Sequence, residues 1–319
     1  MAVYTVLNFA QLSALVMPYR LGALASVQAA TEGVENTNYF LDIAGEEGAV
    51  QSYLLTIFEH LQGSELAFYL HWLEQLEKLA LPVAPAIADR TGRRWTMVSR
   101  KPAALFPKLP GHHPHLPDLS HCRAIGAALG RMHAAALDLG EHHTGPRSLE
   151  WLEALCADLL PTLPRDDSSL MESALRASAP LRAESTLPFG LIHGDLFPDN
   201  TLFVGDQLTG LVDFFSGGDG LLCFDLGVCA NAWCSREDGS LCQSRVDGLL
   251  DAYQKRRSLL PEEIHYWPNI LVLSALRFWA SRLAAQSRPG EDLDESAVIK
   301  SKDPDEYRRI LVHRLNACT

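Results

Sequence analysis

The stretch from Gly190 to Phe203 constrains the fold of this chain more than any other part of the sequence. It contains His193, Asp195 and Asn200 in the spacing H-x-D-x4-N. Asp213 follows thirteen residues after Asn200, at the end of an apolar run that leads into a glycine-containing turn. Asp195, Asn200 and Asp213 therefore lie within nineteen residues of the chain.

Two short apolar runs, Phe189 to Ile192 and Thr201 to Val204, flank the polar loop and predict strands. Buried strand backbone would hold the loop at both ends. The alternative is a surface hairpin whose acidic side chains are simply solvated. Each polar residue alone would favour that alternative, but the joint pattern with Asp213 favours a site for phosphoryl transfer.

Phosphoryl transfer asks little covalent chemistry of a protein, but it requires positioning of the reactants and neutralisation of their charge. A carboxylate beside an acceptor hydroxyl can take its proton. Oxygen ligands from aspartate and asparagine suit a Mg²⁺ ion that is bound to nucleotide phosphates. The motif therefore offers one candidate base and two kinds of metal ligand.

Composition sets the class of protein. The 319 residues suffice for two domains, and the hydrophobic content of 47% with a mean hydropathy near zero is typical of a globular protein. The net charge of -12 disfavours a nucleic-acid partner or an anionic membrane surface, since both require a cationic footprint. A small-molecule substrate fits better. The sequence does not indicate an oligomeric state.

The cysteines and the N-terminus indicate the compartment. Seven cysteines without a C-x-x-C pair argue against a disulfide framework and against a zinc site, and favour buried thiols in a reducing environment. Residues 1–19 lack a basic segment followed by a sustained apolar core, so we expect no signal peptide and a cytoplasmic location.

The pattern of apolar residues predicts an α+β protein with two lobes, 1–110 and 111–319. In the first lobe, a short helix ends near Pro18 and a longer one begins at Ser64, its expected N-cap. Runs of β-forming residues separated by turns predict a five-stranded antiparallel sheet, with a turn at Lys101-Pro102. The expected strands are Leu24 to Ala30, Thr37 to Ile43, Gln51 to Phe58, Arg94 to Ser99 and Ala103 to Leu109.

The second lobe is expected to be mainly helical and to carry the polar loop on a short sheet. Its first helix has Asp118 or Ser120 as the N-cap, and one helix is expected from Glu262 to Ser287. A linker with three histidines, His112, His113 and His115, precedes the first helix. These could bind a metal, but without a partner carboxylate a polar loop is the better interpretation.

A tight turn at residues 32–38 joins two strands of the first lobe, and its backbone N–H groups could cover phosphates. Gly33 stands alone there, without a G-x-G-x-x-G pattern, so the turn by itself also fits an ordinary hairpin. It gains weight because the polar loop follows at the distance that a two-lobed kinase needs.

Motifs spread over almost the whole chain resemble those of known protein families. His193 to Asn200 and Leu211 to Phe214 resemble the motifs of the phosphotransferase superfamily of aminoglycoside and choline kinases. A narrower set resembles the bacterial homoserine kinases of the pseudomonad type, and comprises residues 1–5, 32–38, 54–59, 230–234, 275–283 and 302–307. The resemblance implies a protein-kinase-like fold, with a nucleotide-covering lobe and a lobe for catalysis and acceptor binding.

The resemblance also implies roles for single residues. Asp195 would be the catalytic base and His193 would orient the loop. Asn200 and Asp213 would bind Mg²⁺, and Asp225 would support the loop from behind by hydrogen bonds. Apart from the resemblance, the turn residues Gly33, Val34, Glu35 and Asn36, through backbone N–H groups, and Thr56 are the first-lobe candidates for binding the phosphates of ATP.

One departure from the kinase pattern is the third strand, where Leu55-Thr56-Ile57 replaces the lysine that usually pairs with a helix glutamate. No Lys or Arg lies between Arg20 and Lys78, so an ion pair with Glu65 cannot be assumed. A catalytically inactive nucleotide-binding protein is therefore one alternative, although the intact base and ligand positions argue against it.

By resemblance, we expect ATP-dependent phosphorylation of the side-chain hydroxyl of L-homoserine, on the route to threonine. The alternative is a related kinase that acts on choline, an aminoglycoside, hydroxylysine or another amino alcohol. A homoserine site needs a basic group for the carboxylate and an acid for the ammonium. Arg277 and Arg282, on an apolar helix, are candidates for the first, although both could equally be structural.

Overall fold

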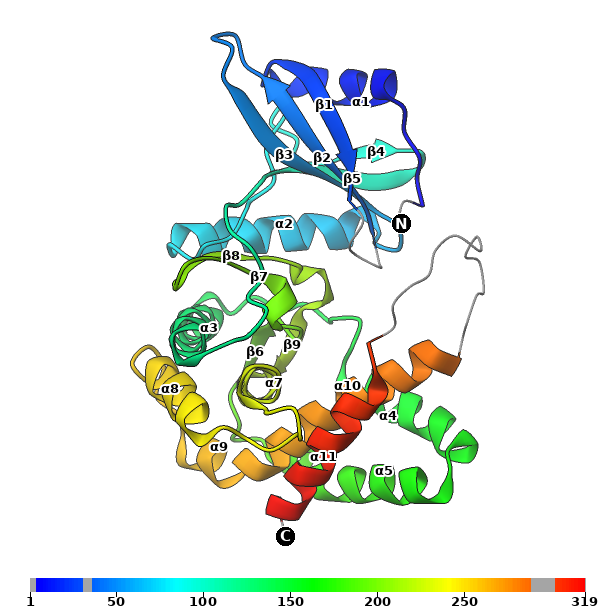
Figure 1. Ribbon diagram of the computed structural model, residues 1–319, viewed down its shortest axis with the longest axis vertical. Coiled ribbons are helices and arrows are strands. Elements are labelled where there is room, and N and C mark those ends of the chain that lie inside the picture. Colours follow the sequence, from blue (N-terminus) through cyan, green and yellow to red (C-terminus); the bar gives the residue numbers. More distant parts are fainter. Residues whose placement is uncertain (1–3, 31–35, 288–301, 319) are drawn as a thin grey trace. The chain divides into compact units, whose positions relative to one another are not determined.

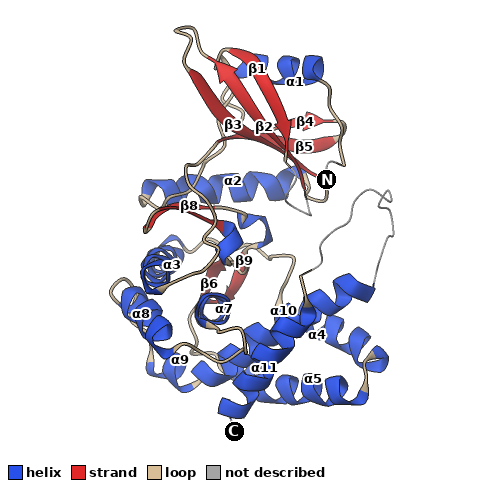
Figure 2. Ribbon diagram, in the orientation of Figure 1, coloured by secondary structure: helices blue, strands red, loops and turns tan. Residues whose placement is uncertain are grey.

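The chain separates after Pro110. The computed structural model describes residues 4–30, 36–287 and 302–318. The described residues up to Pro110 form one compact unit, and those from Gly111 onward form another. Figure 1 labels the elements of both units, and Figure 2 shows that the first is built on a sheet and the second mainly on helices.

The first unit is a five-stranded antiparallel sheet in the order β1-β2-β3-β5-β4, as the sequence predicts. Alternate residues of β2, among them Leu41 and Ile43, are buried on one face, where Leu12 and Val16 of α1 join the same core. The elements of this unit are α1 (Phe9–Val16), η1 (Met17–Tyr19), β1 (Ala23–Ala29), β2 (Asn36–Ala44), β3 (Val50–Phe58), α2 (Gly63–Lys78), β4 (Thr96–Val98) and β5 (Lys101–Pro107).

Two local predictions in this unit are wrong. The last hairpin turns at Ser99 and Arg100, whose φ angles are 49° and 68°, and not at Lys101-Pro102, which begins β5. Helix α2 starts after Gln62 and not at Ser64. The reason is a capping box, in which the side chain of Glu65 accepts a hydrogen bond from the backbone N–H of Gln62 at 2.7 Å.

The second unit packs helices around two small sheets. Helix α10 lies against α7, α11, α4 and α5, and α3 runs along α8. The elements are α3 (Leu119–Leu139), α4 (Leu149–Leu159), η2 (Leu160–Thr162), α5 (Arg165–Ser178), α6 (Pro180–Ala183), β6 (Phe189–Ile192), η3 (Pro198–Asn200), β7 (Thr201–Val204), β8 (Gln207–Leu211), η4 (Phe214–Ser216), β9 (Gly218–Leu221), α7 (Leu222–Cys234), α8 (Gln243–Gln254), α9 (Pro261–His265), α10 (Trp267–Ser287) and α11 (Pro304–Cys318).

The strands that flank the polar loop belong to different sheets. β6 pairs with β9 and β7 pairs with β8, both antiparallel, so the alternative of a simple surface hairpin is wrong. The strand-like run that precedes Asp213 is the end of β8, whereas β9 was not expected, because glycines and an aspartate interrupt its apolar pattern. The helix expected from Glu262 to Ser287 is interrupted at Tyr266, and the proline that follows lies in the first turn of α10.

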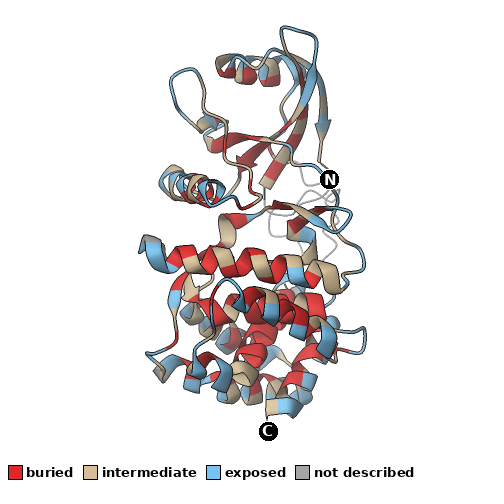
Figure 3. Cartoon of the chain, turned by 90° about the vertical axis from the view of Figure 1, so that its left-hand side faces the viewer, coloured by how far each residue is buried: buried red, intermediate tan, exposed pale blue. Residues whose placement is uncertain are grey.

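Apolar side chains from α4, α5, α7, α10 and α11 form the main core of the second unit. Figure 3 shows how far the described residues of each unit are buried. Asp118 is the N-cap of α3, one of the two expected residues. All seven cysteines are free thiols. Among the helices that the structure describes, none is long and apolar enough to span a membrane.

Candidate active site

The polar loop between β6 and η3 is held by a buried carboxylate of α7. Asp225 accepts hydrogen bonds from the backbone N–H groups of His193 at 2.8 Å and Gly194 at 2.9 Å. Gly194 has a φ of 73°, in the left-handed region that a glycine adopts without strain. The pKa of Asp225 is lowered, because the hydrogen bond from His133 and the charges and backbone around it outweigh the effect of burial. The carboxylate therefore fixes the start of the loop.

His193 is fully buried and ties the loop to the chain after β8. Its Nε2 lies 3.0 Å from the carbonyl oxygen of Val212, and its Nδ1 lies 3.3 Å from the backbone nitrogen of Asp195. The ring also contacts that of Phe214, with centroids 4.6 Å apart. These contacts fit a ring that donates through Nε2 and accepts through Nδ1. The ring thus constrains the backbone of Asp195 without facing solvent.

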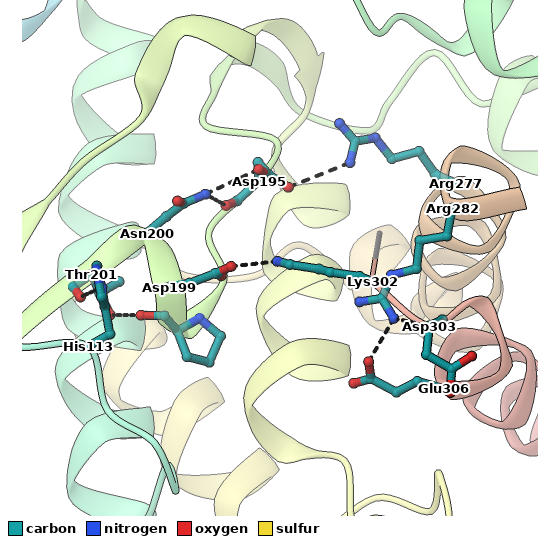
Figure 4. A network of polar contacts seen from close by, with 11 residues as sticks. His113, Asp195, Asp199, Asn200, Thr201, Arg277, Arg282, Lys302, Asp303 and Glu306 are labelled. Carbon is teal, nitrogen blue, oxygen red and sulfur yellow. Dashed lines mark hydrogen bonds and ion pairs between the residues drawn. The ribbon is translucent and has the colours of Figure 1, made fainter. Parts of the chain in front are cut away.

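Asp195 and Asn200 face each other across the loop (Figure 4). The side-chain Nδ2 of Asn200 donates to the carbonyl oxygen of Asp195 at 2.7 Å and to its Oδ2 at 3.1 Å. Because the amide nitrogen is used in this way, the other end of the Asn200 side chain, Oδ1, can act as a hydrogen-bond acceptor or as a metal ligand.

The other carboxylate oxygen of Asp195, Oδ1, lies 3.8 Å from Nη1 of Arg277 on α10. Burial raises the pKa of Asp195, and the positive charge of Arg277 opposes that rise. Burial likewise lowers the pKa of Arg277 to about 10, although Asp195 opposes this change. The pair stands beyond hydrogen-bonding distance, so Asp195 keeps an oxygen for another partner.

Asn200 and Asp213 lie at neighbouring ends of the β7–β8 hairpin. Thr201 pairs with Leu211 in that hairpin, and the backbone N–H of Val212 donates to the carbonyl oxygen of Asn200 at 3.1 Å. Asp213 is exposed, in the left-handed conformation with φ 63°. One amide oxygen and one carboxylate are hard ligands of the kind that Mg²⁺ takes when phosphates and water complete its shell, so the residues fit that ion.

The two arginines of α10 have different surroundings. Arg282 donates to the carbonyl oxygen of Asp303 at 2.7 Å and to Oε2 of Glu306 at 2.6 Å, and it lies over the ring of Tyr307. Arg277 is only 3% exposed, and its Nη1 has no hydrogen-bond partner among the described residues. The structure therefore satisfies Arg282 and leaves Arg277 available to a ligand.

Arg277 lines two adjoining cavities next to the loop. The smaller, about 20 Å³, reaches Gly194 and Ser216, and the larger, about 120 Å³, extends between apolar residues of α4, β6 and α10. Arg147 and Asp219 line both cavities. Sequence reasoning missed these two residues, because neither belongs to a motif and they lie far apart in the chain.

A chain of buried hydrogen bonds behind the loop was also missed. Nη1 of Arg257 donates to the hydroxyl of Tyr253 at 2.9 Å, and that hydroxyl lies 2.8 Å from Nδ1 of His133. Nε2 of His133 lies 3.2 Å from Oδ2 of Asp225, and Glu263 closes the far end through two hydrogen bonds with Arg257. The loop is thus linked to α3, α8 and α9.

In the first unit, Gly33, Val34 and Glu35 lie outside the described residues. Asn36 begins β2, and its Oδ1 accepts from the backbone N–H of Glu59 at 3.3 Å. Thr56 is buried in β3, and its hydroxyl donates to Oδ1 of Asn38 in β2 at 2.7 Å.

An ion pair of this sheet joins Glu59, at the end of β3, to Lys101 at the start of β5. The charge-assisted hydrogen bond from Lys101, with those from two threonines, lowers the pKa of Glu59 against the effect of burial. Glu65 serves the N-terminus of α2 instead. No pattern in the sequence points to the Lys101 pair, because strand register decides which residues meet.

The histidines of the linker hold it against β7. Nδ1 of His113 lies 2.8 Å from the carbonyl oxygen of Thr201 (Figure 4), and the backbone of His112 pairs with that of Phe203. Within the described residues, no cluster of three or more His, Cys, Asp or Glu could hold a metal. His113 thus makes a structural contact between the linker and β7.

Comparison with known proteins shows the family of this chain. The phosphotransferase enzyme family matches residues 26–259. A homoserine kinase of Pseudomonas aeruginosa (strain LESB58) is 37% identical over 99% of this chain and 97% of its own length. A homoserine kinase of Polaromonas naphthalenivorans is also 37% identical, over 99% of this chain and 98% of its own.

Solved structures with low sequence identity share the fold. The amicoumacin kinase hAmiN, in complex with AMP-PNP, Ca2+ and Ami, has a TM-score of 0.67 at 17% identity, over 97% of this chain and 93% of its own. The spectinomycin phosphotransferase APH(9)-Ia, in complex with ADP and spectinomycin, has a TM-score of 0.68 at 11% identity, over 98% and 99%. The chain therefore belongs to the phosphotransferase enzyme family, and within it to the branch that contains these homoserine kinases.

Proposed function

We propose that this protein transfers the terminal phosphoryl group of ATP to the side-chain hydroxyl of L-homoserine, giving O-phospho-L-homoserine on the route to threonine. The observation that carries the proposal is the loop, in which Asp195 is held between Asn200 and Arg277 and keeps a carboxylate oxygen for a substrate. Relatives that align along nearly the whole chain are named homoserine kinases, which supports the choice of acceptor.

Asp195 is the proposed base. Its carboxylate accepts the proton of the acceptor hydroxyl as the oxygen of that hydroxyl bonds to phosphorus and the bond to ADP breaks. His193 positions the base, because its ring holds the backbone of Asp195 while facing away from solvent. Asp225 positions the loop through two backbone N–H groups. Proton acceptance at this stage contributes about 100- to 10,000-fold to a rate.

The nucleotide is proposed to bind as its magnesium complex. Asn200, through Oδ1, and Asp213 would hold Mg²⁺, which neutralises the charge of the phosphates when bound. Residues 1–110 would cover the nucleotide, with the turn at Gly33, Val34, Glu35 and Asn36 and with Thr56. Residues 111–319 would carry catalysis and acceptor binding.

The test is the identity of the phosphorylated product. Purified protein with MgATP would be offered L-homoserine, L-serine, L-threonine, choline and kanamycin in separate reactions, with product detected by ³¹P NMR. We expect O-phospho-L-homoserine to form with a kcat/KM at least about 100-fold above that for any other acceptor. Preferential phosphorylation of another acceptor would reject homoserine, and ATP binding without any product would reject a kinase.

A further inference from the structure

Two cavities adjoin each other beside the polar loop, and both belong to the second unit. Both are lined by two cations, Arg147 and Arg277, by one anion, Asp219, and by apolar side chains such as Ile192 and Phe224. The volume of the larger, about 120 Å³, exceeds several times the roughly 10–15 Å³ that one water requires by this kind of measure. The space therefore suits a solute of a few heavy atoms that carries charge.

The cavity wall is set by close contact of two glycines. Gly218 of β9 lies against Gly145, so near that an added Cβ would stand 2.4 Å from the Cα of Gly145. This contact brings the segment that carries Arg147 against the strand that carries Asp219. Glycine at both positions therefore allows charged residues distant in sequence to line one space.

Arg277 presents an unmatched donor to this space. Its guanidinium is buried, and Nη1 lies 3.8 Å from Asp195, beyond the range of about 2.7–3.2 Å for an N–H···O hydrogen bond. A buried N–H group without an acceptor is costly, particularly when the group is charged. An anionic ligand in the cavity would remove that cost. A carboxylate fits best, because a guanidinium can bind both of its oxygens.

Asp219 presents the complementary feature. Its backbone N–H donates to the carbonyl oxygen of His143 at 2.7 Å, which fixes the residue in β9. Its Oδ1 is buried and makes no hydrogen bond within the described residues, and Nδ1 of His142 lies 3.4 Å from it. An ammonium group, with three N–H donors, would satisfy this oxygen.

We infer that the two cavities bind the amino-acid acceptor as a zwitterion, with Arg277 holding its carboxylate and Asp219 holding its ammonium group. The inference rests on the proposed function, and it names the groups that select the acceptor. Asp195 stands beside Arg277, so a carboxylate held by that guanidinium places the side-chain hydroxyl of the same molecule close to the base. A cationic amino alcohol without a carboxylate leaves Arg277 unsatisfied, and the site therefore discriminates against it.

Two analogues of homoserine separate the two charges. 4-Hydroxybutanoate lacks the ammonium group, and 3-aminopropan-1-ol lacks the carboxylate. Each would be measured as an inhibitor of homoserine phosphorylation by the wild-type protein and by two variants, Arg277→Met and Asp219→Asn, which serve as controls for each other. Both variants should raise the KM for homoserine about 30-fold or more and change the KM for MgATP less than threefold.

The inhibition constants should cross over. In Arg277→Met, inhibition by 4-hydroxybutanoate should weaken about 30-fold or more while that by 3-aminopropan-1-ol stays within threefold. In Asp219→Asn, inhibition by 3-aminopropan-1-ol should weaken about 30-fold or more, while that by 4-hydroxybutanoate stays within threefold. Arg277→Lys, which keeps the charge, should restore part of the affinity for 4-hydroxybutanoate, and it replaces the methionine variant if that variant does not fold.

The failures are distinguishable. Suppose that the wild-type protein phosphorylates homoserine. If a variant then weakens inhibition by both analogues to the same extent, or by neither analogue, the zwitterion site is wrong and the proposed function stands. A change in kcat alone would mean that Arg277 acts only on Asp195, which also overturns the inference. If the wild-type protein does not phosphorylate homoserine at all, the proposed function fails and the inference fails with it.

Discussion

Arg277 and Arg282 stand five positions apart on α10, and the sequence alone does not distinguish them. Both are buried cations on an apolar helix. Their partners differ, because Arg282 meets the start of α11 whereas Arg277 faces the catalytic loop and the cavities. At the scale of single residues, tertiary contacts decide which arginine is structural and which can bind a substrate.

Arg282→Met should therefore destabilise the protein without affecting substrate binding. The variant loses hydrogen bonds to the carbonyl oxygen of Asp303 and to Glu306, and a charged hydrogen bond is worth about 1.5–3 kcal/mol. We expect the free energy of unfolding, from urea titration, to fall by about 1–3 kcal/mol. The KM for homoserine should stay within threefold. A large rise in that KM with unchanged stability would instead make Arg282 the carboxylate ligand.

At the scale of elements, the polar loop depends on helices that are remote from it in sequence. The hydroxyl of Tyr253 on α8 connects Arg257 to His133 on α3, and His133 in turn contacts Asp225 on α7. No spacing in the sequence predicts this series of hydrogen bonds, because its residues lie far apart in the sequence and only packing brings them together. Strand β9 escaped prediction for a related reason, since pairing with β6 overrides its weak local pattern.

Tyr253→Phe should weaken this connection. It leaves Nδ1 of His133 without its donor in a buried site, which costs about 1–3 kcal/mol. We expect an equal loss in the free energy of unfolding and a severalfold fall in kcat, because the loop is less well fixed. Tyr266→Phe is the matched control, as that hydroxyl makes only a 3.4 Å contact with Glu184. Equal effects of the two substitutions would show that the buried chain contributes nothing.

Stability should also fall in mild acid because of His133. Burial lowers the pKa of His133 in the folded protein, against the opposing effect of Asp225. The unfolded chain takes up that proton below about pH 6.5, so it binds more protons than the folded chain there. The free energy of unfolding should therefore decrease as pH falls below about 6.5, by up to about 1.4 kcal/mol per pH unit from this residue.

The charged groups around His133 are Asp225, Arg257 and Glu263. The check is the slope of unfolding free energy against pH from 7 to 5, for wild type and for His133→Gln. The variant should have a shallower slope than the wild type over this range. An unchanged slope in His133→Gln would contradict the expectation.

At the scale of the whole molecule, the sequence predicted the α+β class and the antiparallel sheet, because their apolar periodicity is local. It also predicted the loop, since His193, Asp195 and Asn200 lie within eight positions of one another. The acceptor cavity could not be predicted, because Arg147, Asp219 and Arg277 come from segments that meet only after folding. Motifs thus indicated the proposed chemistry, and the structure was needed to find the groups that are proposed to select the acceptor.

The central claim is that Asp195 accepts the proton of the acceptor hydroxyl, and kcat of Asp195→Asn tests it most directly. The substitution preserves size but removes the base, so kcat for homoserine with saturating MgATP should fall about 100- to 10,000-fold. Asp206→Asn, in the exposed turn between β7 and β8, should leave kcat within twofold. A folded Asp195→Asn variant with a kcat within threefold of wild type would contradict the account.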